Sequence, residues 1–291
     1  MKIKRPLSER IFEVFNLTFM TILMIVTIYP FWYVLIASIS KPAQFMAHKG
    51  ILMIPQGFSL DSYIAVFNNP SIWTGYRNTL LYVVLGTTLN VFLTIITAYV
   101  LSRKHFLLKN FLMVLAVFTM FFSGGLIPSY LVVKDLHLTE TIFAIILPSA
   151  ISTYNVIVLR TAFLGVPDAL EESAKIDNAN DWVILFRIIL PVCMPSVAVI
   201  TLFYAVGHWN SWFSAMIYLR DRTMYPLQLI LREILVLSNV EDMTTGLENQ
   251  IAISETIKYA TIIVATVPIL IVYPFLQKYF VKGVMIGAIK G

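Results

Sequence analysis

The chain has 291 residues, of which 58% are hydrophobic and only 13% are charged, and its mean hydropathy is +0.81. These values exclude an ordinary soluble globular domain and are typical of a membrane protein. The single cysteine, Cys193, excludes an internal disulfide and a metal cage of several cysteines, and the net charge of +5 comes without the basic stripe of a nucleic-acid-binding surface.

Apolar runs separated by short polar segments predict an all-α polytopic membrane protein with six transmembrane helices. The first run is longer than the hydrophobic part of a cleaved signal peptide, so we expect it to be retained. The third and fifth runs contain glycine and proline residues of the kind that interrupt membrane helices. The predicted spans cover about 15–39, 80–101, 111–133, 141–159, 188–219 and 259–276, within a single transmembrane domain of residues 1–291.

The distribution of basic residues predicts which side of the membrane each segment faces. Six spans place both termini on one side, which then also holds the turn 102–110 and the segment 160–187. That side carries thirteen of the 21 Lys and Arg residues, so we expect it to be cytoplasmic. The loops 40–75 and 220–258 are then extracytoplasmic, and the first of them is expected to be ordered.

The predicted spans contain none of the charged groups that drive ion-coupled transport. No Asp, Glu, Lys or Arg lies inside them, and His208 is the one titratable group of that kind. Intramembrane ionisable groups mark proton relays, so this pattern disfavours an ion-coupled secondary carrier. The four histidines are scattered through the sequence and form no set with carboxylates or a nucleophile, which disfavours a membrane-embedded enzyme such as a glycosyltransferase or protease.

The cytoplasmic segment 168–187 is unusually acidic for this chain. Asp168 as N-cap, with Glu171 three residues later, forms a capping box and predicts a helix from Ala169 to Asp177. Asn178 tolerates the left-handed conformation that commonly ends helices, so the helix should stop there. A second helix then leads into the fifth span. A rigid docking element and a solvated connector on the membrane surface are the two interpretations of this pattern.

Residues of this segment resemble the EAA loop of permease subunits of ATP-binding-cassette importers, whose pattern is E-A-A-x-x-x-G followed by I-x-L-P. The matching residues are Glu172-Ser173-Ala174, Ile176-Asp177-Asn178-Ala179, Ile188 and Leu190-Pro191. Serine replaces the first motif alanine, and asparagine, which can take over a positive φ, replaces the glycine. FFSGGLIPSYL, HWNSWFSAMIYLRDR and the tail KGVMIGAIKG resemble the second permease of carbohydrate importers, in the polysaccharide-fragment group.

The resemblance implies a type I importer permease fold in the bacterial cytoplasmic (inner) membrane, with a coupling helix. The partners it implies are a homologous second permease, two cytoplasmic ATPases, an extracytoplasmic solute-binding protein and membrane lipid, but no nucleic acid. This chain would be non-catalytic and hold no metal or cofactor, because the ATPases would bind ATP and Mg. The tail would either fray or insert between the ATPases. The coupling residues would be Glu171, Glu172, Ser173, Ala174, Asp177 and Asn178, with Glu172 contacting an ATPase and Ala174 packing closely against it.

The solute implied by the resemblance is a carbohydrate, and sugars are bound by aromatic faces combined with amides and hydroxyls. An amide in hydrocarbon needs a partner, so Asn155 and Asn210 should face the pore or another helix. Trp212 fits the interfacial aromatic belt, and His208 fits a hydrogen-bonded structural group. The loop 220–258 would receive the binding protein or cap a neighbouring subunit. The candidate path residues are Tyr154, Asn155, Tyr204, Trp209 and Asn210.

Overall fold

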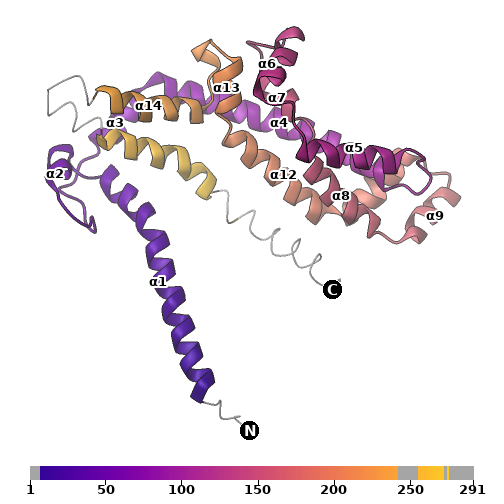
Figure 1. Ribbon diagram of the computed structural model, residues 1–291, viewed down its shortest axis with the longest axis horizontal. Coiled ribbons are helices and arrows are strands. Elements are labelled where there is room, and N and C mark those ends of the chain that lie inside the picture. The colour runs from indigo at the N-terminus through magenta and orange to yellow at the C-terminus, as the bar shows by residue number, and fades with distance from the viewer. Residues whose placement is uncertain (1–6, 242–254, 272–273, 275–291) are drawn as a thin grey trace. The chain divides into compact units, whose positions relative to one another are not determined.

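The computed structural model describes residues 7–241, 255–271 and 274 (Figure 1). Throughout these ranges the regular secondary structure is helical and contains no strand, as predicted. The chain divides into two compact units, one of residues 1–70 and 231–267 and the other of residues 71–230 and 268–291. The C-terminal tail and much of the loop 220–258 lie outside the described residues, so the roles predicted for them stay predictions.

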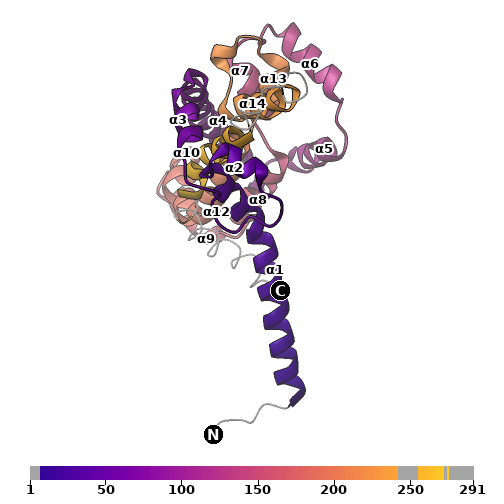
Figure 2. The same cartoon turned by 90° about the vertical axis from the view of Figure 1, so that its left-hand side faces the viewer.

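In the first unit, one long helix precedes an ordered loop. Helix α1 (Leu7–Ser38) runs without interruption for 32 residues and contains the first predicted span except its last residue (Figure 2). Two short helices, α2 (Pro42–Ala47) and α3 (Asp61–Asn68), give the loop that follows the order expected from the sequence. Residues 255–271 form a further helix, which belongs to this unit up to residue 267 and carries the first part of the predicted sixth span.

Aromatic side chains hold the loop of the first unit to its last helix. The rings of Tyr33, Phe45 and Tyr259 meet edge to face, with centroids 5.6–6.3 Å apart, an arrangement that aromatic pairs favour. The hydroxyl of Ser62 donates a hydrogen bond of 2.8 Å to the hydroxyl of Thr256. Helix α3 is therefore fastened to the helix of residues 255–271 by a buried polar contact.

The second unit combines one long helix with a series of shorter, bent ones. Helix α4 (Pro70–Ser102) has 33 residues and includes the whole of the second predicted span. The helices that follow in this unit are α5 (Lys109–Phe121), α6 (Leu126–Asp135), α7 (Ile142–Ile146), η1 (Leu147–Ser149), α8 (Thr153–Leu164), α9 (Asp168–Ile176), α10 (Asp181–Val183), the π-helix η2 (Ile184–Ile189), α11 (Leu190–Val192), α12 (Met194–Trp209), α13 (Phe213–Tyr218) and η3 (Arg222–Met224). Helix α14 (Leu227–Glu241) begins in this unit, and its residues from 231 onwards belong to the first unit.

Within the described residues, two helices are long and apolar enough to cross a membrane by themselves, namely α1 and α4. Three bent pairs of helices pass the same test together: α5 with α6 at 118°, α7–η1 with α8 at 52°, and α10–α11 with α12 at 87°. If each pair counts as one span, the described residues hold up to five. The sixth predicted span falls partly outside those residues, so the count of six stays a prediction.

Two of the bends occur at glycine or proline residues of the third and fifth predicted spans. Helix α5 gives way to α6 at Gly125, whose φ of +86° suits glycine. The fifth predicted span is not one helix, because α11 and α12 meet at a sharp bend next to Pro195, which cannot donate to the preceding turn. Gly207, the glycine of the fifth predicted span, does not interrupt the helix there, since it lies inside α12, which continues to Trp209.

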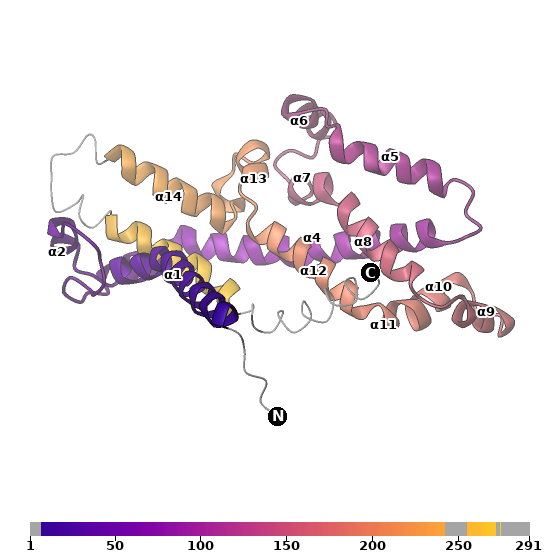
Figure 3. The ribbon, with the colours of Figure 1, turned by 60° about the horizontal axis from the view of Figure 1, so that its bottom comes forward.

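Side chains of α4 hold irregular backbone from the later part of the second unit. Asn78, Thr79 and Tyr82 make hydrogen bonds to backbone groups of residues 223–227, at donor–acceptor distances of 2.7–3.0 Å. Further along, α4 lies beside α8 and α12 (Figure 3). Helix α4 is therefore the element on which the other helices of this unit are assembled.

An apolar core surrounds the end of α4 and extends to α9. The arginine Arg160 of α8 adds a polar tie, because its Nε donates to the carbonyl of Leu101 at 2.9 Å. Because Ala174 of α9 is buried in this core, α9 packs together with the longer helices α4, α8 and α12. The core includes Ala98, Tyr99, Leu159, Phe163, Ala174, Ile184, Ile189 and Ile200.

Helices α4 and α12 lie so close at Gly86 that one added methyl group should destabilise the fold. A Cβ added at Gly86 of α4 would lie 2.4 Å from Nε2 of His208. We expect Gly86→Ala to lower the midpoint of thermal unfolding in detergent, since overpacking costs roughly 1–3 kcal/mol. Gly207→Ala is the matched control, because a Cβ there meets nothing within 4 Å. Equal midpoints for the two variants would contradict this packing.

Candidate functional site

Helix α9 begins one residue earlier than the capping pattern predicts. Its first residue is Asp168, and its N-cap is Pro167, with φ −58° and ψ 132° and no side-chain cap. The predicted N-cap role of Asp168 is therefore wrong. The reason is that the carboxylate of Asp168 receives a hydrogen bond of 2.5 Å from Lys104 Nζ instead of bonding to its own helix.

The end of α9 confirms the prediction for Asn178. This residue has φ +56°, and its N–H donates to the carbonyl of Lys175 at 3.0 Å. The N–H of Ala179 donates to the carbonyl of Ala174 at 2.9 Å, which completes a Schellman motif. The next helix is capped by Asn180, whose side chain accepts from the N–H of Val183 at 2.9 Å. Both ends of the intervening turn are thus fixed by hydrogen bonds.

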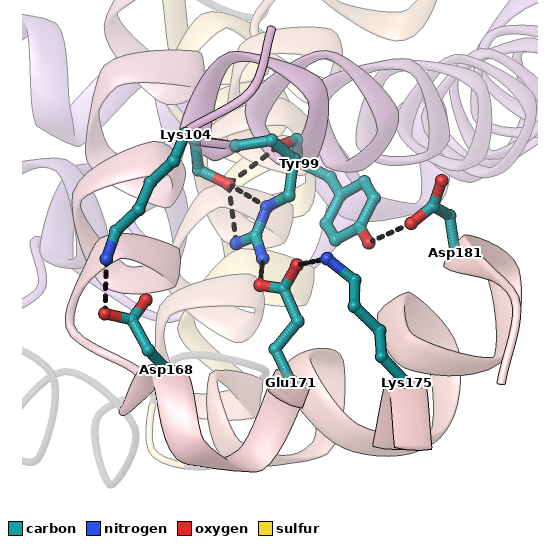
Figure 4. Close-up of polar contacts among 8 residues, drawn as sticks. Tyr99, Lys104, Asp168, Glu171, Lys175 and Asp181 are labelled. Carbon is teal, nitrogen blue, oxygen red and sulfur yellow. Dashed lines mark hydrogen bonds and ion pairs between the residues drawn. The ribbon is translucent and has the colours of Figure 1, made fainter. Parts of the chain in front are cut away.

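An ion pair joins α9 to the residue that follows α4 (Figure 4). The guanidinium of Arg103 pairs with the carboxylate of Glu171 and lies 4.6 Å from the centre of the Tyr99 ring. The Tyr99 hydroxyl donates to Asp181 Oδ1 at 3.3 Å. Arg103 also donates from Nη2 to the hydroxyl of Ser102 at 2.9 Å. The end of α4 therefore contacts both α9 and the helix that begins at Asp181.

The pairs in this network differ in their exposure. The side chains of Arg103 and Glu171 are each 19% exposed, whereas those of Lys104 and Asp168 are 69% and 60% exposed. Lys104 lowers the pKa of the Asp168 carboxyl by its hydrogen bond, but water and salt screen a pair so exposed. Glu171 accepts a second bond, of 2.7 Å, from Lys175 within α9. The Arg103–Glu171 pair is thus the stronger tie.

Two of the predicted coupling residues of α9 face the interior of this chain. Ala174, which we expected to pack against a partner ATPase, is only 7% exposed and lies in the chain's own apolar core. Glu171 likewise faces Arg103 rather than solvent. Both side chains are thus directed at residues of this chain, and their predicted part in coupling to an ATPase stays a prediction. The predicted coupling residues that are exposed are Glu172, Ser173, Asp177 and Asn178, and the neighbouring Ile176 is 82% exposed.

Sequence reasoning missed Arg103 and Tyr99 as parts of this site. Arg103 was counted only as one of the basic residues that orient the chain, and Tyr99 as one aromatic residue in a span. No local pattern connects either residue to α9, because Arg103 and Glu171 are 68 positions apart in the chain. The available signal was a basic turn directly after a span, opposite an acidic segment on the same side.

A cavity of about 640 Å³ lies in the second unit between α4, α8, α12 and the turn before α13. Four of the five predicted path residues line it: Tyr154, Asn155, Tyr204 and Asn210. Trp209 does not, and packs edge to face with Tyr76 at 6.4 Å. Trp212 lines the cavity, although the sequence favoured the membrane interface for it.

Hydrogen bonds hold a broken helix at the wall of this cavity. Residues 150–152, between η1 and α8, leave backbone groups without helical partners. The Tyr204 hydroxyl accepts from the N–H of Ser152 at 2.9 Å and lies 2.7 Å from the hydroxyl of Thr94. His208, expected to be hydrogen-bonded, is 3.2 Å from the side-chain amide of Asn90. Among the residues that the structure describes, no group of His, Cys, Asp and Glu could hold a metal ion.

The amino-acid sequence places this arrangement in a known family. Residues 90–286 match the family described as binding-protein-dependent transport system inner membrane component. The chain belongs to this family. It is accordingly a multi-pass membrane protein and a transport permease, and the family resemblance noted in the sequence is confirmed.

Similar permeases of known name cover almost the whole chain. The polygalacturonan/rhamnogalacturonan transport system permease protein YtcP of Bacillus subtilis (strain 168) is 42% identical over 98% of this chain and 100% of its own length. The arabinooligosaccharides transport system permease protein AraQ of Halalkalibacterium halodurans is 27% identical over 91% of this chain and 92% of its own length.

A solved structure confirms the permease fold. A chain from the crystal structure of a bacterial ABC transporter involved in the import of the acidic polysaccharide alginate matches with a TM-score of 0.88 at 32% identity. The match covers 96% of this chain and 100% of that chain. The type I importer permease fold predicted from the sequence is therefore shown.

The Arg103–Glu171 pair predicts how firmly α9 is held in this permease. Arg103→Met should leave Glu171 with Lys175 alone and loosen α9 by roughly 1–2 kcal/mol, between the values of surface and buried pairs. Hydrogen exchange of residues 168–176 should then be about tenfold faster. Lys104→Met is the control, because its pair is exposed, and it should leave the exchange nearly unchanged.

The charge-reversed double variant separates the ion pair from general damage. Arg103→Glu combined with Glu171→Arg should recover part of the protection that either single reversal loses. If Arg103→Met and Lys104→Met accelerate exchange equally, the ion pair does not hold α9.

Proposed function

We propose that this chain is one of two permease subunits of an ATP-driven, binding-protein-dependent importer of an oligosaccharide or polysaccharide fragment. The observation that carries the proposal is α9, a helix that ends in a Schellman motif, contacts the end of α4 on one face and is exposed on the other. The names of the relatives, which include transporters of polygalacturonan, arabinooligosaccharides and alginate, support a carbohydrate as the solute.

The exposed face of α9 is the surface that would dock into a cytoplasmic ATPase. Ile176 offers an apolar side chain that the chain itself does not cover, and Ser173 is small enough for close approach. Glu172 and Asp177 place carboxylates beside this apolar centre. An exposed apolar residue rimmed by charges is a common composition for a protein contact. Ala174 and Glu171 then act from inside, by fixing the helix against α4.

Energy from ATP would enter as a movement of α9. The ATPases bind ATP and Mg and carry out hydrolysis, while this chain remains non-catalytic. If closure of the ATPases favours one position of α9, the Arg103–Glu171 pair and the shared apolar core pass that preference to α4. The physical requirement is a difference in the free energy of ATPase binding between the inward-facing and outward-facing states.

This role requires both termini and α9 to be cytoplasmic, as the basic residues predict. The loop that begins at Arg220 would then lie outside, where a solute-binding protein could contact it. Its first turn is already rigid, because the carboxylate of Glu140 accepts hydrogen bonds from the backbone N–H groups of Arg220 and Asp221 at 2.8–3.3 Å. The cavity beside α12 would form this chain's half of the solute path.

A charged substitution on the exposed face of α9 should disrupt assembly with the partner ATPases. Ile176→Glu should abolish copurification with the partner ATPases and ATP-dependent uptake, because a carboxylate would replace the exposed apolar side chain. Solute capture by the isolated binding protein should be unchanged. Asn178→Gly is the matched control, since glycine also adopts positive φ, and it should keep both assembly and uptake.

The same experiment tests the alternative of an ion-coupled carrier. Uptake into proteoliposomes should require ATP and persist when ionophores collapse the ion gradients. Uptake that depends on a gradient and not on ATP would overturn the proposal, as would normal assembly of the Ile176→Glu variant.

A further inference from the structure

A cavity in the first unit combines three aromatic rings with a carboxylate. It has a volume of about 270 Å³ and lies between the end of α1, the loop that contains α2, and the start of the helix of residues 255–271. Ligand sites usually begin at roughly 300 Å³, so this cavity suits a small head group and not an oligosaccharide. The lining residues on which the inference depends are Tyr33, Phe45, His48, Glu255 and Tyr259.

The aromatic rings stand steeply to one another around this space. Tyr33, Phe45 and Tyr259 make interplanar angles of 63–79°, and their centroids are 5.6–6.3 Å apart. All three side chains stay partly exposed although they pack together. The face of an aromatic ring carries partial negative charge, and several rings around one space form the cage in which proteins hold ammonium groups. The cavity therefore favours an organic cation.

Glu255 adds a formal negative charge to the same wall. Its Oε1 accepts a hydrogen bond of 2.6 Å from Nζ of Lys258, whose side chain is 9% exposed and does not line the cavity. Within the described residues, no donor reaches the other oxygen, Oε2, and this atom is not buried. A primary ammonium group inside the cavity can therefore donate to Oε2, which gives a charge-assisted hydrogen bond.

Among the described residues that line the cavity, no Lys or Arg competes for this position. His48 lies on the wall, but its Nε2 faces the carbonyl of Ile51 at 3.4 Å. A carbonyl only accepts, so this nitrogen donates within the loop. The carboxylate and the rings are thus left to a cation from outside the chain.

The cavity is held open next to a membrane helix. Tyr33 lies near the end of α1, which is long and apolar enough to cross a membrane. From the same part of α1, Trp32 Nε1 donates to the carbonyl of Met53 at 3.0 Å, and the Tyr29 hydroxyl accepts from the N–H of Leu52 at 3.2 Å. Trp and Tyr gather at the level of the lipid head groups. The site is therefore formed before a ligand binds, at the depth where head groups lie.

We infer that this cavity binds the primary ammonium group of a phospholipid head group. The three rings surround the ammonium group, and Glu255 Oε2 accepts a hydrogen bond from it. The acyl chains lie along α1, whose neighbouring apolar side chains, including Ile28 and Phe31, are exposed. A bound lipid then joins α1, the loop and the helix of residues 255–271. This role concerns the surrounding membrane and goes beyond the proposed transport of a solute.

The test measures lipid binding to the purified full-length chain in detergent by isothermal titration calorimetry. The probes are dihexanoyl phosphatidylethanolamine, dihexanoyl phosphatidylglycerol, which has the same acyl chains but no ammonium group, and free ethanolamine. We expect the ethanolamine lipid to bind about tenfold more tightly than the glycerol lipid. Free ethanolamine should bind more weakly than its lipid, because it lacks the chains that contact α1.

Fluorination of Phe45 separates attraction of a cation from packing. Mono-, di- and trifluorinated phenylalanine at this position keep the shape of the ring and withdraw charge from its face. Affinity for the ethanolamine lipid should fall stepwise, to about tenfold weaker with three fluorines, while affinity for the glycerol lipid stays constant. Glu255 is left intact, since its substitution would also remove the ion pair with Lys258.

Phe58→Leu is the matched control for Phe45→Leu. Phe58 lies in the same loop and is 64% exposed, but it does not line the cavity. Phe45→Leu should weaken binding of the ethanolamine lipid about tenfold, and Phe58→Leu should leave it unchanged. Equal losses in the two variants, equal affinities for the two lipids, or a constant affinity across the fluorinated series would overturn the site. Free ethanolamine that binds as tightly as its lipid would overturn the assignment to a lipid.

Discussion

Backbone groups that lack a helical partner need another one wherever the protein excludes water, and α4 supplies many of these partners in the second unit. Near its start, Asn78, Thr79 and Tyr82 bond to the irregular backbone of residues 223–227. Halfway along, Asn90 bonds to the carbonyl that precedes the break before α8. One unbroken helix therefore permits its neighbours to be bent, and the bends are what create a cavity with polar walls.

The same helix connects the two places where function is proposed. Asn90 at the cavity and Arg103 at the coupling helix are thirteen positions apart, which is about 20 Å along a helix. Between them α4 has no proline, glycine or break, so it can move as a rigid body. The ion pair with Glu171 lies at one end of this stretch, and the amide that faces His208 lies at its other end, near the middle of α4. In the proposed mechanism, a displacement of α9 reaches the cavity wall without passing through a loop.

Features that depend on neighbouring residues, such as helix ends and turns, were predicted from the sequence. Features that depend on residues far apart in the chain, such as ion pairs and core packing, were missed. The limits of α9 were right to within one residue, and Asn178 has the expected positive φ, because caps and turns depend on neighbours in the chain. Asp168 was misassigned since a lysine 64 positions away competes for its carboxylate. Proline and glycine marked possible bends, but only packing decides that the chain bends beside Pro195 and stays helical through Gly207. The inward direction of Ala174 likewise depends on the core around it.

The absence of charged residues from the described wall of the cavity bears on how an importer built from this chain would move an anionic solute against the membrane potential. A membrane potential that is negative inside opposes the inward movement of an anion by about 2.3 kcal/mol per charge for each 100 mV. The described lining of this cavity includes no Lys or Arg that could lower the barrier for an anion inside it, and a fixed cation would in any case leave the work across the potential unchanged. For a solute with several carboxylates, the work must be supplied by ATP or offset by accompanying cations, whereas a neutral oligosaccharide crosses without it. The charge of the solute therefore limits how many sugar residues one transport cycle can move.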